Sequence, residues 1–531
     1  MSRFAASAVL ALILATSGAR PADPAGSWRM ALPAGDGSSF ILLIALENKG
    51  GQWSGKYLGG TTDAPQGTTV ERVRVTDDRV QFVLKNGDQE LPFDGKLPAV
   101  ARKIAGSFLY GGRLVLTALE PSKLTAYDRF ELLKELVTDG EPNATFFDAA
   151  VELLRAAGSK QVKADEVRAW AERTNQAAEA FGVRWQQAIA LRMAQALAHQ
   201  KEYAVVALAQ AQRAEKLLDP GDPSDARLIV LEVLFELLRA NEQTADRARV
   251  KALIEQTEVR DYEEYQKQFP FKPDPYPGRQ GPGTRVVLVE MFTGAECPPC
   301  VAADLAYDGI GRTYKPSEVL RLQYHLNIPF PDPLTNATTL ARQKYYGVNG
   351  TPAAFVNGKT VDDAGGPAGV AVQRFTHFRR LIDPILELPA LAKLNLTAAR
   401  DGDKITIRAK VSELVKPGER MRLRVFLAED VVRYRGGNGV RYHHAVVRSV
   451  LSPETGFPLR QATTEHSAEL NLGDLRKSLA ADLEKFQKEY DEVPNADRLL
   501  SLKKLFVIAL IQDDGTREVV QAGQAEIKES R

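Results

Sequence analysis

The chain of 531 residues contains only two cysteines, Cys297 and Cys300, and the two residues between them are prolines. A disulfide that closes so short a loop removes little entropy from the unfolded chain, so a disulfide with only a structural role would add little stability here. Two neighbouring thiols can instead exchange with other thiols and disulfides, or they can bind a soft metal ion such as Cu(I) or zinc. The pair therefore predicts redox chemistry or one half of a metal site.

The residues around the cysteines predict a strand, a loop and a helix, in that order. Residues 285–292 (RVVLVEMF) are β-branched and apolar, as in a buried parallel strand, and residues 302–310 show apolar positions at helical spacing. Cys297 is thus expected at a helix N-terminus, where unpaired N–H groups and the helix dipole stabilise a thiolate. We expect an exposed Cys297 to attack a disulfide, and Cys300, one turn further in, to resolve the mixed disulfide.

A later segment, residues 348–358 (VNGTPAAFVNG), predicts a short strand between a Thr-Pro step and an Asn-Gly turn. Together with the strand and helix around the cysteine pair, this segment resembles the thioredoxin superfamily. The resemblance implies that Pro352 is the family's cis-proline beside the cysteines, and that Thr351 contacts substrate and tunes the thiolate. It also implies that Glu290 is the buried acid that assists proton transfer from Cys300.

The sequence departs from the family's pattern at three places. Glu290 lies one residue further upstream than the usual buried acid, and Glu296 replaces the aromatic residue that usually precedes the first cysteine. The charge of Glu296 is expected to raise the pKa of the thiol and to alter substrate choice. The segment 324–334 makes the chain between Cys300 and Pro352 longer than in minimal thioredoxins, and it is a candidate to cover the site.

The rest of the chain predicts a multidomain fold, because 531 residues exceed what one compact core holds. Alternating strands, helical periodicity and a Pro/Gly-rich stretch mark the parts. We expect a signal peptide at 1–19, a small antiparallel β-barrel or sandwich at 26–121, an α-helical, tetratricopeptide-like domain at 123–268, a linker at 269–283, an α/β thioredoxin-like domain at 284–388, and a C-terminal β-sandwich with insertions at 390–531. The thioredoxin-like module followed by a β-sandwich with residues 431–439 (VVRYRGGNG) resembles exported bacterial proteins distantly similar to the thioredoxin-like outer-membrane protein family.

The N-terminus predicts export. Arg3 precedes a short apolar run, residues 5–15, and small residues lead to an expected cleavage after Ala19. No cysteine follows the run, which argues against a lipid anchor, and no later segment is apolar enough to span a bilayer. We therefore expect a periplasmic or secreted protein with no transmembrane segment after removal of the signal. Lys plus Arg number 69 and Asp plus Glu 68, so we expect no nucleic-acid partner.

These observations together predict an exported thiol–disulfide oxidoreductase that acts on envelope or secreted proteins and needs no cofactor. Its partners would be the thiols or disulfides of client proteins and an unidentified protein that renews the pair. One alternative is a copper- or zinc-binding protein with Cys297, Cys300 and His325 as ligands. Another is a non-enzymatic scaffold whose thioredoxin-like module is a relic. His443 and His444 are adjacent on an expected strand and point to opposite faces, which disfavours joint chelation.

Overall fold

The computed structural model describes residues 23–33, 39–61, 67–98, 103–110, 112–490, 493 and 496–530. The predicted signal peptide at 1–19 lies outside these residues. The chain divides into two compact units, each with its own hydrophobic core. The first unit comprises the described residues of Met1–Asp222 with Leu237–Val250, and the second comprises those of Pro223–Glu236 with Lys251–Arg531. The division into two units is coarser than the predicted division into domains, so the predicted domain borders remain untested.

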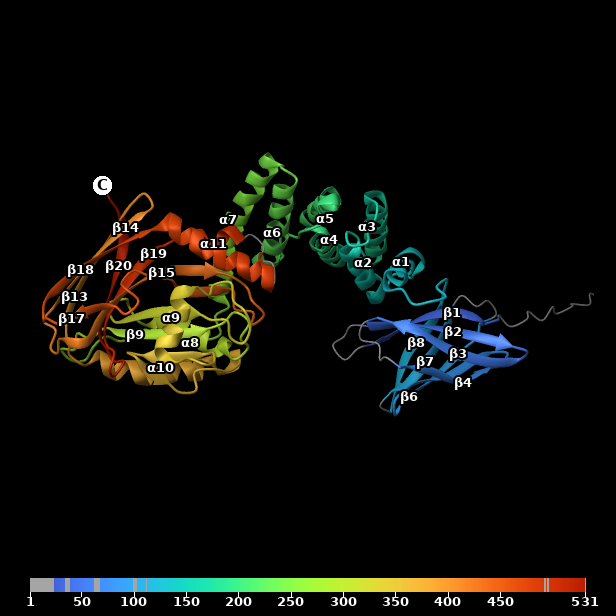
Figure 1. Ribbon diagram of the computed structural model, residues 1–531, viewed down its shortest axis with the longest axis horizontal. Helices are drawn as coiled ribbons and strands as arrows, with labels where there is room; N and C mark the ends of the chain where they lie inside the picture. The colour runs from blue at the N-terminus through green and yellow to red at the C-terminus, as the bar shows by residue number, and fades with distance from the viewer. Residues whose placement is uncertain are drawn as a thin grey trace, which may run out of the picture. The chain divides into compact units, whose positions relative to one another are not determined.

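The first unit begins with eight antiparallel strands in the order β3-β2-β1-β8-β7-β6-β5-β4 (Figure 1). Alternate side chains such as Trp28, Met30 and Ile44 fill the interior. The end strands approach each other, because a Cβ on Gly55 would lie only 2.3 Å from a methyl carbon of Val70. The sheet is therefore a nearly closed barrel, which confirms the predicted small antiparallel β-barrel or sandwich. The strands are β1 (Gly26–Pro33), β2 (Ser39–Lys49), β3 (Gln52–Gly60), β4 (Thr69–Val75), β5 (Arg79–Asn86), β6 (Gln89–Lys96), β7 (Ile104–Tyr110) and β8 (Arg113–Ser122).

Helices follow the barrel along the chain, as the periodicity predicts. Asp128 and Asn143 accept backbone N–H groups at the starts of the first two helices, which satisfies donors that a helix leaves unpaired. The helices are α1 (Arg129–Asp139), α2 (Ala144–Ala156), α3 (Ala164–Ala178), α4 (Val183–Leu197), α5 (Ala204–Lys216), α6 (Ser224–Ala240) and α7 (Thr244–Lys267). The border between the two units passes through α6 and α7, so parts of both helices belong to the second unit.

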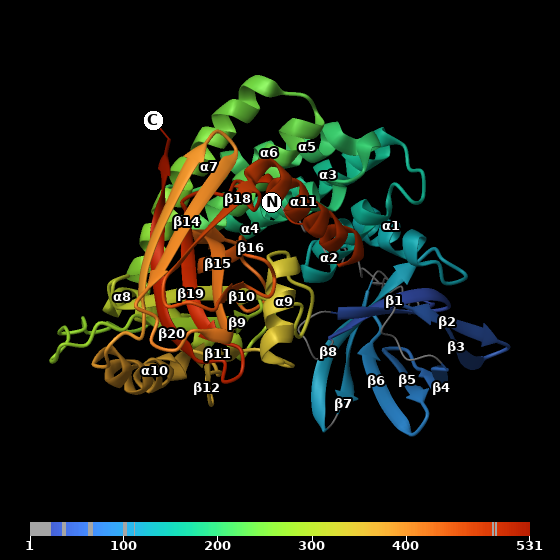
Figure 2. The ribbon, with the colours of Figure 1, turned by 60° about the vertical axis from the view of Figure 1, so that its left-hand side comes forward.

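The second unit is built on a mixed sheet of twelve described strands in which β9–β12 are continued by strands of the C-terminal region. The join is a parallel pairing of β10 with β16, where Gln323 lies opposite Val446. Figure 2 shows β19 and β20 running side by side through this sheet. The strands are β9 (Val287–Thr293), β10 (Val319–His325), β11 (Ala353–Val356), β12 (Lys359–Val361), β13 (Lys393–Asp401), β14 (Lys404–Ser412), β15 (Gly418–Arg433), β16 (Tyr442–Val450), β17 (Phe457–Leu459), β18 (Thr464–Asn471), β19 (Leu505–Asp513) and β20 (Val519–Glu529).

This sheet differs from the predicted arrangement, in which a thioredoxin-like domain at 284–388 and a β-sandwich at 390–531 would be separate. The difference has a physical reason. β10 presents an edge with unpaired N–H and C=O groups, and β16 covers that edge. Apolar residues of β9 and β10 also share one core with Phe426 of β15 and Ile508 of β19.

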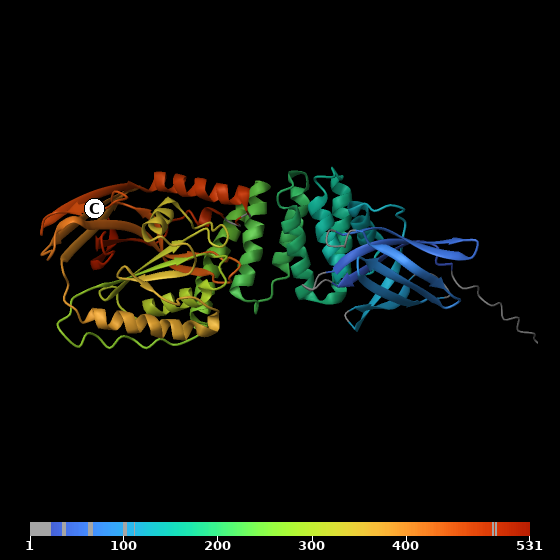
Figure 3. The same ribbon diagram turned by 60° about the horizontal axis from the view of Figure 1, so that its bottom comes forward.

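Helices cover both faces of the strands that carry the cysteine loop (Figure 3). Val287, Val289 and Met291 of β9 pack against α8 (Cys300–Thr313) and α10 (Ala371–Leu386). The alternate residues of β9 face α9 (Ala337–Tyr346) on the other side. A further helix, α11 (Leu472–Glu489), packs into the C-terminal core. In the described part of the chain, no helix combines the length and apolar character that crossing a membrane requires.

Candidate redox site

A disulfide joins Cys297, which lies just before α8, to Cys300, the first residue of α8. Both cysteines are 0 % exposed, whereas the two prolines between them are exposed. The burial differs from the expectation of an exposed Cys297, because segments from elsewhere in the unit lie against the cysteine loop. Since the chain has no other cysteine, the oxidised protein has no free thiol.

Backbone hydrogen bonds fix the cysteine loop to a neighbouring segment. The N–H of Cys300 donates to the carbonyl of Cys297 at 3.1 Å. The N–H of Ala302, in the first turn of α8, donates to the carbonyl of Gly366 at 3.0 Å, and the N–H of Gly366 donates back to Pro299 at 2.7 Å. One of the N–H groups that a helix N-terminus offers to a thiolate is therefore already occupied.

The predicted residues Thr351 and Pro352 lie beside the cysteine pair. The peptide bond between them is cis, as expected. The carbonyl oxygen of Thr351 lies 3.5 Å from the sulfur of Cys297, so it can accept a hydrogen bond from the thiol of the reduced pair. Gly365 fits between Pro352 and the cysteine loop, because a Cβ there would lie 2.9 Å from the proline ring and 3.2 Å from the carbonyl of Pro299. The structure thus brings together four of the five predicted site residues.

The fifth predicted residue, Glu290, faces the α9 side of β9. Its buried carboxylate forms an ion pair with Arg342 at 2.8 and 2.9 Å, and it accepts hydrogen bonds from the hydroxyls of Tyr324 and Tyr346. Burial alone would raise the pKa of Glu290, but Arg342 and these hydrogen bonds hold it below its usual range. A carboxylate so strongly held in its charged form is a poor proton carrier near neutral pH, so this geometry lends no support to the implied role.

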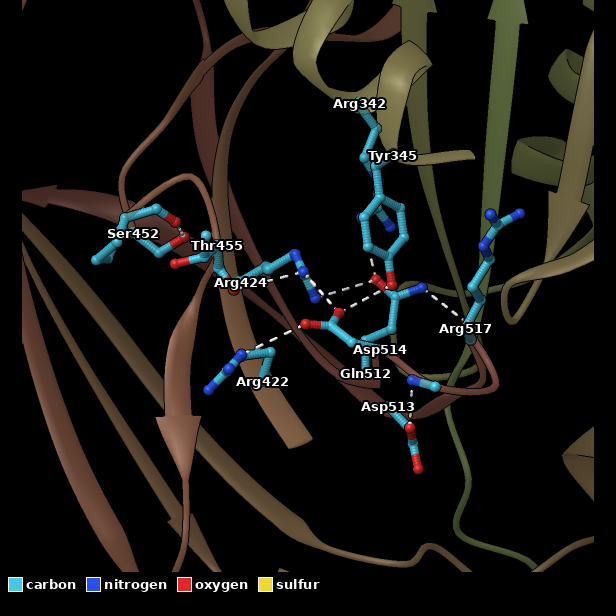
Figure 4. Close-up of polar contacts among 12 residues, drawn as sticks. Arg342, Tyr345, Arg422, Arg424, Ser452, Thr455, Gln512, Asp513, Asp514 and Arg517 are labelled. Atoms are coloured by element: carbon cyan, nitrogen blue, oxygen red, sulfur yellow. Dashed lines mark hydrogen bonds and ion pairs between the residues drawn. The ribbon is translucent and has the colours of Figure 1, made fainter. Parts of the chain in front are cut away.

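Arg342 continues the network toward the C-terminal strands (Figure 4). It donates to Gln512 of β19 at 3.0 Å, and Arg424 of β15 lies 3.4 Å from the same amide oxygen. Arg424 also pairs with Asp514 at 2.7 Å, which accepts a hydrogen bond from Tyr345 at 3.0 Å. The buried Arg342 and Arg424 thus tie α9 to β15 and β19 through Gln512 and the partly exposed Asp514.

Asp304 is a buried carboxyl that the sequence interpretation missed. It follows Cys300 by four residues on α8, which places it one helical turn further along the same face. Its oxygens accept hydrogen bonds from Thr293 at 2.9 Å and Gln323 at 3.0 Å. Burial raises the pKa of Asp304 to about 7, although nearby His325 and these hydrogen bonds oppose the shift. The spacing of four from Cys300 was the signal that could have found it.

Replacing Asp304 by asparagine is expected to make the protein more stable at pH 8 than the unsubstituted chain, and equally stable near pH 4. The carboxyl has a pKa near 3.8 when unfolded and about 7 when folded. The folded state therefore keeps the proton more tightly and loses stability as pH rises between these values. At 1.36 kcal/mol per unit, a shift of about three units makes the gain of the variant at pH 8 about 4 kcal/mol. Urea unfolding at both pH values measures it.

Asp362→Asn, at an exposed position in the same unit, is the matched control and should show no such difference. An Asp304→Asn effect of equal size at pH 4 and pH 8 contradicts the assigned titration.

His325, the third ligand of the metal alternative, is engaged in a different contact. Its Nδ1 lies 2.8 Å from Asp332, whose same oxygen accepts the N–H of Ala295 at 2.7 Å. His443 contacts the carbonyl of Tyr434 at 3.0 Å, and burial together with His325 lowers the pKa of His443 to about 3. Among the described residues, no group of three or more His, Cys, Asp or Glu side chains is arranged to hold a metal ion.

Comparison with known proteins gives little further information. No protein-family model and no curated protein matches the chain. One similar solved structure is HBP35 of Porphyromonas gingivalis, with 16% sequence identity and a TM-score of 0.33. The match covers 47% of this chain and 77% of that chain. A TM-score this low does not establish a shared fold, so nothing about fold or function follows from it.

Proposed function

We propose that the protein is a thiol–disulfide oxidoreductase with a thioredoxin-like domain, acting through Cys297 and Cys300 on client proteins of the cell envelope or the secreted fraction. The observation that supports the proposal is the disulfide between the chain's two cysteines at the N-terminus of α8, with the carbonyl of Thr351 beside one sulfur. The proposed location rests on the predicted signal peptide alone.

The oxidised pair takes two electrons from a client dithiol. A client thiolate attacks the sulfur of Cys297, which breaks the disulfide and releases the sulfur of Cys300. The second client thiolate then attacks the client sulfur of the mixed disulfide, so that the client gains a disulfide and Cys297 is released. Two electrons and two protons pass from client to pair, and a disulfide-bearing partner protein accepts them to renew it. The reverse sequence reduces a client disulfide.

Asp304 is suited to move the proton of Cys300. It lies one helical turn beyond that residue, and its pKa of about 7 lets it bind and release a proton near neutral pH. Glu290, held charged by Arg342, is not suited to this role. In the proposed mechanism Thr351 and Pro352 align the client chain, as the resemblance to the thioredoxin superfamily implies.

Equilibration with glutathione buffers, followed by alkylation and mass measurement, should yield one two-electron transition for Cys297 and Cys300. The protein should also catalyse disulfide formation in a reduced two-cysteine peptide, or reduction of the oxidised peptide. The matched control replaces both cysteines by serine, and it should behave like buffer in both directions. If the unsubstituted protein behaves like this control in both directions, the redox proposal is wrong.

One observation favours a second candidate function. Both cysteines are inaccessible, as expected for a relic module in a non-enzymatic scaffold. A redox role requires that whatever covers the pair can move.

A further inference from the structure

A loop from the C-terminal region lies directly on the cysteine loop. We call residues 434–441, which connect β15 to β16, the cover loop. Its residue Asn438 donates its backbone N–H to the carbonyl of Ala295 at 3.0 Å. The side-chain amide of Asn438 lies 3.1 Å from the carbonyl of Gly294 and 3.5 Å from that of Cys297. One asparagine thus contacts three carbonyls of the segment that leads into the disulfide.

The cover loop also packs closely against the cysteine loop. The N–H of Gly437 donates to the carboxylate of Glu296 at 2.9 Å. A Cβ on Gly436 would lie 2.4 Å from the carbonyl oxygen of Ala295, and a Cβ on Gly437 would lie 2.3 Å from the Glu296 carboxylate. Only glycine therefore fits at position 436 while the loop is closed, whereas a side chain at position 437 would require the flexible Glu296 side chain to shift. The exposed Gly439 has a φ of +79°, a conformation that glycine adopts without strain.

Arg433, just before the cover loop, and Arg435 and Arg441 within it form ion pairs with acidic residues on the parts of α6 and α7 that belong to the same unit. Asp261 of α7 is fully buried, and Glu232 of α6 is nearly so. The ion pairs are Arg433–Glu232 at 3.0 Å, Arg433–Asp261 at 2.9 Å, Arg435–Asp225 at 3.1 Å, Arg441–Asp225 at 3.4 Å and Arg441–Asp261 at 3.3 Å. Several mutually paired charges hold a loop more firmly than an isolated surface pair does.

We propose that the cover loop is an autoinhibitory element that closes the Cys297–Cys300 site, and that α6 and α7 hold it closed through Asp225, Glu232 and Asp261. The proposal that the cover loop regulates activity rests on the proposed redox function. A client chain that reaches the cysteines must displace Asn438 from Gly294 and Ala295. Displacement leaves those carbonyls free to bind donors of the client backbone, so the cover loop and the client occupy the same place.

The test measures how fast the disulfide of the full-length protein is reduced by tris(2-carboxyethyl)phosphine, with the thiols trapped by alkylation and counted by mass. Asn438→Ala removes the side-chain contacts, and Asp225→Asn weakens the anchor on α6. Both variants are expected to be reduced about tenfold faster than the unsubstituted protein, as fits the loss of two or three hydrogen bonds or ion pairs from the closed state.

Asn395→Ala, at an exposed site on β13, is the matched control and should leave the rate unchanged. Circular dichroism checks that each variant is folded. Folded Asn438→Ala and Asp225→Asn proteins that are reduced at the unsubstituted rate overturn the proposal.

The same variants separate this proposal from the redox function. If both variants are reduced faster but no form of the protein turns over a two-cysteine peptide, the cover loop is supported and the proposed redox function is refuted. If the unsubstituted protein turns over the peptide and the two variants change neither this turnover nor the reduction rate, the redox function is supported and the autoinhibitory role of the cover loop is refuted.

Discussion

Cys300→Ser is expected to accumulate mixed disulfides with client proteins, whereas Cys297→Ser is expected to lower exchange to the rate of the double serine variant. Cys297 precedes α8, and its sulfur lies beside the carbonyl of Thr351, where a client chain would run. Cys300 is the first residue of α8, and its N–H is bonded back into the cysteine loop. Without Cys300 the mixed disulfide forms but has no internal thiol to resolve it.

Non-reducing gels of envelope extracts, run beside reduced samples of the same extracts, measure the trapped species. Trapping by Cys297→Ser instead of Cys300→Ser would reverse the assigned roles. Neither change should unfold the protein, because a disulfide between cysteines only three positions apart constrains the unfolded chain little.

Glu290→Ala is expected to destabilise the second unit by about 3–5 kcal/mol, because it leaves the buried guanidinium of Arg342 without its counter-charge. Thermal or urea unfolding, followed by near-UV circular dichroism, measures the loss. The control is the double variant Glu290→Leu with Arg342→Met, which removes both charges and should be less destabilised than Glu290→Ala.

Glu290→Gln tests whether Glu290 instead carries a proton during thiol–disulfide exchange. If its folded form loses turnover and shifts the pH profile of exchange, Glu290 carries a proton and the structural assignment is wrong. If only stability changes, the carboxylate serves the ion pair.

Local sequence patterns predicted the elements that form the site. The apolar run at 285–292 corresponds to β9, and the helical spacing after the cysteines corresponds to α8. In the barrel, the sequences of β6 and β7, QELPFDGK and IAGSFLY, give weak strand signals because they carry glycine or proline. Strands without a clear period remain hidden until their neighbours in the sheet are known.

Contacts between distant residues set the limit of sequence interpretation. Nothing local to Glu290 indicates that Arg342, 52 residues later, neutralises it. Nothing local to β10 indicates that β16 will cover its edge and thereby join strands from before and after residues 388–390 in one sheet. The glycine-rich cover loop similarly had no visible connection with the cysteines, because only the fold brings it there.

The distance along the chain between the cysteines and their cover has a consequence for synthesis. Asn438 follows Cys297 by 141 residues. At 5–20 residues per second, the growing chain carries Cys297 for roughly 7 to 28 seconds before Asn438 has been added. The cover loop therefore cannot close over the cysteines of the nascent chain until all of its residues up to Asn438 have been made.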